Sequence, residues 1–182
     1  MEAQNRLDEL TNLSSKSVYL AAYGNTDQEA LRANDAIFPL LQDLKNKNQV
    51  IEFSSIGSLI QSEDSQNEKI AKWQSFWTSE KIETTKENII QSGNRLGFKS
   101  GTFNDFYELL ATNFSPLEVD DYKALKTIST DDYITSKDDF TTVATLVKVK
   151  DEYLQKVVET FKGFPQTVVI DRKHMNETFL GN

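Results

Sequence analysis

The spacing of apolar residues predicts four β-strands. In residues 17–23 and 140–150, the side chains alternate between two faces, which is the period of a strand in a sheet. Gly24 ends the stretch 17–23, and Gly57 ends a further stretch at 50–56, because glycine interrupts an extended pattern. The four predicted strands are residues 17–23, 50–56, 140–150 and 167–171.

Amphipathic helices are predicted between these strands. Apolar residues recur at helical spacing from Ile37 to Leu44, and Thr26 or Asp27 can cap the start of that helix. Pro39 lies within the pattern and is expected to kink the helix, since proline has no backbone N–H to donate. Two further helical patterns are Leu154–Phe161, which ends at Gly163 and Pro165, and a short leading pattern at Leu7–Leu13.

Residues 57–128 have a different pattern and are predicted to be helical throughout. A helix over about 82–96 is expected to stop at Gly97, the residue type that most often ends helices. Three further helices are indicated by the residues that can cap their first turns. These start signals are a Ser65–Glu68 capping box, Thr102, and the run Ser115–Glu118 with proline at its second position.

The order of these elements predicts an α+β fold. Two β-α-β units in series form a ferredoxin-like βαββαβ sandwich, whose antiparallel sheet has the strand order 4-1-3-2. The expected domains are residues 1–56 and 129–182 for the sandwich, and 57–128 for an all-helical insertion between strands 2 and 3. The first and last strands then pair, so the chain near Ser17 lies beside Asp171. Adjacent ends suit a domain inserted into a larger protein.

Composition excludes several classes of protein. The 182 residues include 20 Lys and Arg against 28 Asp and Glu, which gives a net charge of −8. Nucleic-acid binding requires clustered basic residues, so we expect no nucleic-acid partner. The absence of cysteine excludes disulfides, thiol nucleophiles and cysteine-ligated metals. No apolar run approaches the roughly 20 residues that a membrane-spanning helix needs.

Catalytic chemistry has little support in the sequence. His174 is the single histidine and has no partner for a metal site or a catalytic triad. Gly93 and Gly97 do not have the spacing of a phosphate loop, and are expected to end one helix and lead into the next. Residues 118–139 hold seven carboxylates but no calcium-loop pattern. We therefore predict no catalytic residue, cofactor or metal; a hydrolase using carboxylates of 118–139 is the enzymatic alternative.

Aromatic residues are concentrated in the middle of the chain. Of 19 aromatic residues, 11 fall between Trp73 and Phe140. They can fill the core of a small helical block, which needs large side chains. Phe76 lies off the helix face shared by Trp73 and Trp77, so part of this surface can also remain open for an apolar ligand or a partner. The candidate residues are Trp73, Phe76, Trp77, Phe103, Phe106 and Tyr107.

Several local runs together point to one family. They are Leu7–Leu10, Ser17–Gly24, Ile70–Trp77, Leu96–Lys99, Thr141–Val149 and, above all, VIDRKHMNETFLG at 169–181. These runs resemble the extramembrane loop of bacterial exporters of the resistance-nodulation-division (RND) superfamily, on its MMPL side. The porter modules in such loops resemble βαββαβ units, in agreement with the fold expected above.

The resemblance implies a non-enzymatic domain on the periplasmic side of the bacterial inner membrane. It implies export of a lipid or other hydrophobic substrate, with the domain forming part of the path or a partner surface. The implied partners are the second periplasmic loop and the transmembrane helices of the same chain, with a second copy as a further candidate. Residues 176–182 would begin the helix that returns to the bilayer, which favours a fragment of a membrane protein. The alternative is a free-standing small-molecule-binding or regulatory domain of ferredoxin-like fold.

Overall fold

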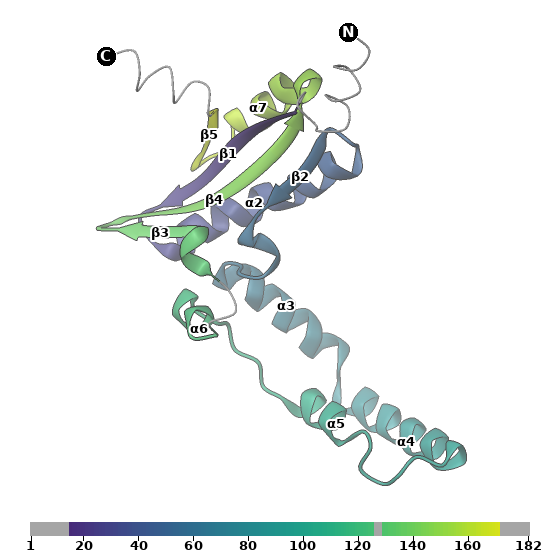
Figure 1. Ribbon diagram of the computed structural model, residues 1–182. Helices are drawn as coiled ribbons and strands as arrows, with labels where there is room; N and C mark the ends of the chain where they lie inside the picture. Colours follow the sequence, from purple (N-terminus) through teal and green to yellow (C-terminus); the bar gives the residue numbers. More distant parts are fainter. Residues whose placement is uncertain (1–14, 126–128, 172–182) are drawn as a thin grey trace, which may run out of the picture. The chain divides into compact units, whose positions relative to one another are not determined.

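The computed structural model describes residues 15–125 and 129–171 (Figure 1). The fold is α+β, as predicted, with an antiparallel sheet and helices. The chain divides into two compact units. We call Met1–Glu63 with Leu117–Asn182 the sheet unit, and Asp64–Pro116 the helical unit. The predicted leading helix at 7–13, His174 and the predicted returning helix at 176–182 lie outside the described residues.

The described part of the chain forms a sheet of five strands, all paired antiparallel. They are β1 (Ser15–Gly24), β2 (Val50–Ser54), β3 (Ile134–Lys137), β4 (Phe140–Lys150) and β5 (Thr167–Asp171). The strand order is β2-β4-β1-β5, and β3 pairs with β4. Val18 of β1 lies opposite Asp171 of β5. The first strand therefore begins where the last one ends, as the sequence predicted.

The β3 strand is the element that sequence analysis missed. It forms a hairpin with β4, with Ile134 opposite Val143 and Lys137 opposite Phe140. Asp138 in the turn has a φ of 52°, a left-handed conformation that Asp tolerates better than most residues. Only Ile134 is apolar in this short strand, and it is buried. Polar and acidic residues surround it, so this segment lacks the alternation of apolar residues that indicates a strand in the sequence.

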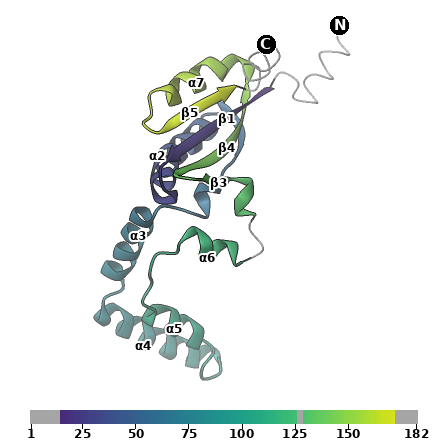
Figure 2. The same cartoon turned by 90° about the vertical axis from the view of Figure 1, so that its left-hand side faces the viewer.

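The two helices α2 (Asp27–Asn46) and α7 (Leu154–Lys162) contribute the helical side of the core. Figure 2 shows α2 beside β1, and α7 beside β5. The Oγ1 of Thr26 accepts a hydrogen bond from the Glu29 backbone N–H at 3.2 Å, which confirms the predicted cap. Pro39 lies inside α2, which continues on both sides of it as a single helix.

The core lies on one face of the sheet, because side chains alternate along each strand. Val18, Leu20 and Ala22 of β1 point inward with Val143 and Val147 of β4, and all five are fully buried. The opposite face carries exposed apolar side chains, namely Tyr19, Phe140, Leu146 and Val168. Helices α2 and α7 thus cover the inward face of the sheet.

The helical unit is shorter than the helical insertion expected at 57–128. The short 3-10 turn η1 (Ile56–Ser58) and the short helix α6 (Val119–Lys123) both belong to the sheet unit. Ile56, Ile60 and Val119 are buried in the same core as β1 and β4. The boundary between the sheet unit and the helical unit is therefore set by which residues are buried against the sheet. Residues that are close in the sequence can belong to different units.

Three helices form the helical unit, although the first begins one residue before it: α3 (Glu63–Phe76), α4 (Ser79–Leu96) and α5 (Asn104–Ala111). The segments 97–103 and 112–118 are not helical. The expectation that residues 57–128 are helical throughout was therefore wrong. The stop at Gly97 is confirmed, with a φ of 77°. None of the helices among the described residues has both the length and the apolar character needed to cross a bilayer.

The predicted capping box at Ser65–Glu68 was wrong, because α3 begins before it. The backbone N–H and the hydroxyl of Ser62 both donate to Oδ2 of Asp35, at 2.9 and 2.7 Å. The backbone N–H of Glu63 donates to Oε1 of Gln28 at 2.7 Å. Side chains from α2 therefore satisfy the first free N–H groups near the start of α3, and these partners are distant in the sequence.

The predicted starts at Thr102 and Ser115 were also wrong. The Thr102 hydroxyl donates to the Lys99 carbonyl at 2.8 Å instead of accepting from a following helix. The short helix α6 begins after Glu118, whose backbone N–H donates to Oδ2 of Asp121 at 2.8 Å. At both Thr102 and Glu118, a local hydrogen bond forms that differs from the one in the predicted cap.

Candidate functional site: the aromatic cluster of the helical unit

The helical unit leaves most of its apolar side chains at or near the surface. Within residues 64–116, all of which the structure describes, only Gly93 and Leu110 are buried. None of the residues of α3 is buried. The large side chains that are exposed here are Phe76, Ile90, Leu96, Phe98, Leu109 and Phe114. An apolar surface of this kind is typical of a binding site for a ligand or a partner.

Six aromatic rings form a continuous chain of contacts, which we call the aromatic cluster. Trp77 is its centre, with ring centroids 5.0 Å from Phe76, 5.9 Å from Trp73 and 6.2 Å from Phe106. Several contacts are edge-to-face, the geometry favoured by the ring quadrupoles. The members are Trp73, Phe76, Trp77, Phe106, Tyr107 and Phe114. Five of the six candidates from the sequence lie in it.

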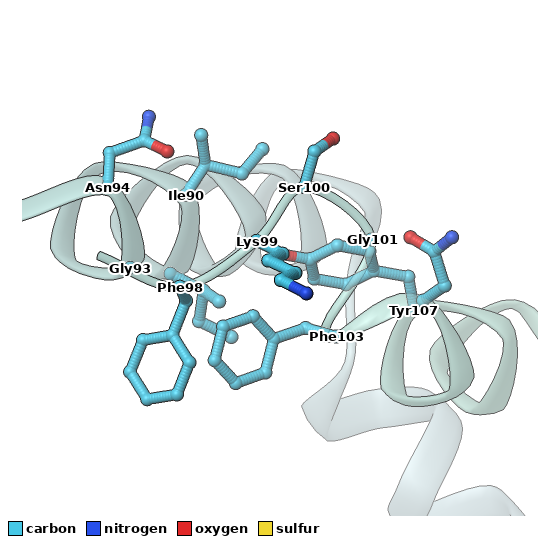
Figure 3. A pocket seen from close by; sticks show the side chains of 11 residues that line it. Ile90, Gly93, Asn94, Phe98, Lys99, Ser100, Gly101, Phe103 and Tyr107 are labelled. Atoms are coloured by element: carbon cyan, nitrogen blue, oxygen red, sulfur yellow. The ribbon is translucent and has the colours of Figure 1, made fainter. Parts of the chain in front are cut away.

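Phe103, the sixth candidate, lies beside a hollow between α4 and α5. Its ring centroid is 5.4 Å from that of Phe98, and Tyr107 lines the same hollow. We call this space the α4–α5 hollow; its volume is about 310 Å³ (Figure 3). This is at the lower end of the roughly 300–1,000 Å³ that small-molecule sites occupy. Its apolar lining is Ile89, Ile90, Phe98, Phe103 and Tyr107.

Glycines at the end of α4 shape the hollow. The N–H of Gly97 donates to the Asn94 carbonyl, and the N–H of Phe98 donates to the Gly93 carbonyl. This pair of bonds is the Schellman motif, which needs a left-handed residue at Gly97. A Cβ at Gly93 would lie 3.4 Å from the Phe103 ring, an ordinary contact distance, so this ring packs beside α4 at Gly93.

Two lysines lie close to aromatic rings of this site. The Lys81 Nζ is 3.8 Å from the centroid of the Phe76 ring, and the Lys86 Nζ is 5.7 Å from that of Tyr107. Both distances are within the range of cation–π attraction. The apolar surface of the helical unit is therefore accompanied by positive charge, although the chain as a whole is acidic.

Phe98 and Phe114 belong to the site but were not among the candidates. Phe98 follows a glycine that ends a helix, a position where an apolar residue commonly packs back onto the last turn. That signal could have identified it. Phe114 lies in the irregular segment after α5, and its ring meets Trp73 at 5.9 Å. No local pattern in the sequence indicates that contact.

A second hollow, of about 330 Å³, lies in the sheet unit. It is lined by Ser17, Glu52, Phe53, Ser54, Leu146 and Lys148. The Lys148 Nζ lies 3.6 Å from Oε1 of Glu52, so the two charges in its lining already face each other. The α4–α5 hollow, which adjoins the aromatic cluster, is the stronger candidate for a ligand.

Two acidic residues of 118–139 make local contacts that stabilise the short helix α6. Asp121 accepts a bond from the backbone of Glu118, and Oδ1 of Asp120 lies 2.9 Å from the Lys123 Nζ. Among the described residues there is no group of three or more His, Cys, Asp or Glu side chains arranged to hold a metal ion.

Comparisons with protein-family models, with curated proteins and with solved structures found no match for this chain. Interpretation of the aromatic cluster therefore depends on its own geometry. That geometry combines accessible rings, a hollow of ligand size and adjacent lysines. These features can bind an apolar molecule or an apolar protein surface.

Proposed function

We propose that this chain is a non-enzymatic periplasmic domain of a membrane exporter of the RND/MMPL type. In this proposal the sheet unit is a ferredoxin-like βαββαβ sandwich, and the helical unit is inserted between its second and third strands. The order β2-β4-β1-β5 supports the sandwich, because it corresponds to 2-3-1-4 when β4 and β5 are counted as the third and fourth strands. The β3 strand is then an addition that pairs along β4.

The pairing of the first and last strands is the observation that carries the proposal. Val18 lies opposite Asp171, and Ala22 opposite Thr167, so β1 and β5 run in opposite directions side by side. The chain therefore approaches β1 and leaves β5 at the same end of the sheet. A domain with this geometry fits between two neighbouring transmembrane helices without distorting either.

The aromatic cluster supports the second part of the proposal, which concerns the substrate. Rings such as Phe76, with 55% of its surface exposed, offer apolar contact area without a change in fold. An exporter domain can use such a surface as part of the path for a lipid or other hydrophobic compound, or as a contact surface. The proposed partners are the transmembrane helices and second periplasmic loop of the same chain, and a second copy.

The proposal is tested by locating the domain in cells that express the complete gene. The chain has no cysteine, so Asn88→Cys, on the exposed side of α4, introduces a single thiol into it. Cysteines elsewhere in the protein are replaced by serine. We expect the protein in the inner-membrane fraction, and labelling of residue 88 by a membrane-impermeant maleimide once the outer membrane is permeabilised.

The contrary result is equally clear. If the protein is found in the soluble fraction, or residue 88 is labelled only after the inner membrane is lysed, the periplasmic exporter domain is excluded. A soluble protein would favour a free-standing small-molecule-binding domain. Labelling after complete lysis is the control for thiol accessibility, because Asn88 is exposed in the helical unit itself.

A further inference from the structure

The α4–α5 hollow contains a positive charge that an apolar substrate alone does not explain. Lys99 lines the hollow, and none of the other lining residues is acidic. Within the described residues, the Lys99 ammonium makes no ion pair with a carboxylate. The chain has 28 acidic residues against 20 basic ones. A lining without carboxylates therefore contrasts with the rest of the molecule.

The lysine is placed where its charge can act inside the hollow. Figure 3 labels Lys99 among the residues that line the hollow, on the segment that joins α4 to α5. Lys86 lies close to the Tyr107 ring, with 5.7 Å between its Nζ and the ring centroid. Asn94, Ser100 and Asn104 complete the polar part of the lining. The hollow thus has apolar walls, one unpaired ammonium and several neutral hydrogen-bonding groups.

We propose that the α4–α5 hollow binds a single-chain amphiphile with a carboxylate head group, of which a long-chain fatty acid is the simplest. The alkyl chain lies on Ile90, Phe98 and Phe103, and the carboxylate pairs with Lys99. Apolar walls favour the chain because they remove it from water. One lysine supplies a single positive charge, which a monoanionic head group neutralises, and a carboxylate is the simplest such group. This inference deepens the proposed function by naming the substrate class.

The test uses the complete, delipidated 182-residue chain and two fluorescent probes, cis-parinaric acid and its methyl ester. The two probes share one hydrocarbon chain and differ in the charge of the head group. We expect the acid to bind more tightly than the ester. Lys99→Met should weaken binding of the acid by about 1.5- to fivefold, the range for an exposed charge pair, and should not weaken binding of the ester. Lys99→Arg should retain binding of the acid.

Matched variants separate the hollow from the rest of the surface. Phe103→Ala removes a wall and should weaken both probes. Phe76→Ala removes a more exposed ring of the aromatic cluster that does not line the hollow, and should weaken both probes less than Phe103→Ala does. Lys72→Met removes an exposed lysine of α3 outside the hollow and should have no effect. Circular dichroism of each variant checks that the fold is intact.

Three results would overturn the inference. Equal affinity of the acid and the ester, unchanged by Lys99→Met, would exclude recognition of the carboxylate. A loss with Phe76→Ala as large as that with Phe103→Ala would show binding to the aromatic cluster in general. No binding of either probe would exclude the site. The maleimide experiment tests the exporter proposal separately, since it does not depend on binding.

Discussion

The sheet unit and the helical unit use apolar residues in opposite ways. Among the described residues, the contiguous hydrophobic core lies wholly in the sheet unit, where side chains such as Leu20 and Phe161 have no exposed surface. In the helical unit Leu110 is the one large apolar side chain that is buried, while Phe76 and Phe98 are about half exposed. The first unit is built from aliphatic burial and the second from contacts between partly exposed rings.

This difference shows where stability and binding are expected to reside. A closed core is stable because each side chain in it makes contacts on every side. Removing a large side chain loses those contacts and leaves a cavity. A ring that already faces water on one side loses less when it is truncated, and can gain contacts when a ligand arrives. The helical unit therefore has the surface for binding, and the sheet unit has the core that maintains the fold.

The largest expected effect comes from truncating a phenylalanine in each unit. Phe161→Ala should lower the free energy of unfolding by about 3–5 kcal/mol, because Phe161 is completely buried. Phe76→Ala should cost about 1 kcal/mol or less, since half of the ring is exposed and its contacts are with Trp77 and Lys81. Urea denaturation measures both values.

The two units can be followed separately in this experiment. Both tryptophans of the chain, Trp73 and Trp77, lie in the helical unit, so tryptophan fluorescence reports on that unit. Far-UV circular dichroism also follows the sheet. If Phe76→Ala were as destabilising as Phe161→Ala, the helical unit would have a closed core, and the comparison between the units would fail.

A pair of glycines provides the next largest effect. An added Cβ at Gly24 would overlap Cβ of Glu29 and approach the Ala30 backbone nitrogen to 2.8 Å. Gly24→Ala should therefore destabilise the sheet unit by about 2–3 kcal/mol, as overpacking does. At Gly97 the space is open but φ is 77°, so Gly97→Ala should cost about 1 kcal/mol. Thermal denaturation compares the two; a smaller loss for Gly24→Ala would contradict the close packing at the end of β1.

The smallest effect concerns alkaline pH and the edge of the core in the sheet unit. Burial of Tyr122 and, secondarily, the negative charge of Asp121 raise the pKa of Tyr122 above its usual value of about 10. Folding then favours the protonated phenol, so its contribution to stability is complete below about pH 10 and is lost as the pH rises through the folded-state pKa. Tyr122→Phe should reduce the loss of stability above pH 10, measured by urea denaturation at several pH values.

Lys123 titrates in the same direction and must be considered in that comparison. Its hydrogen bond to Oδ1 of Asp120 raises the pKa of Lys123, so this contribution is also lost as the pH increases. Comparing Tyr122→Phe with the natural chain at each pH removes the lysine contribution, since Lys123 is present in both. Identical pH dependence of the two proteins would show that the Tyr122 phenol does not contribute.

Local signals predicted a large part of this fold. The alternation in β1 and β4, the Thr26 cap of α2 and the glycine stop of α4 each involve residues close together in the sequence. Such interactions form with the same partners in most folds, so the pattern is sufficient to recognise them. For the same reason the concentration of aromatic residues in one part of the chain was visible before the structure was known.

Other features depended on partners that are distant in the sequence. The start of α3 is determined by Asp35 and Gln28, which satisfy N–H groups of Ser62 and Glu63, and no local pattern contains that information. The short strand β3 exists because β4 supplies its hydrogen bonds. Phe114 joins the aromatic cluster through Trp73, far earlier in the chain. Each of these contacts requires the folded arrangement.

The sequence by itself determined the α+β class, the acidic charge, the absence of cysteine and the region that holds the aromatic side chains. The tertiary structure decided which of those side chains are accessible and which of them line a hollow with Lys99. The physical reason is that residue type and spacing are properties of the chain, whereas exposure depends on what packs against each side chain. In the helical unit little packs over the rings, and for that reason they are available to bind.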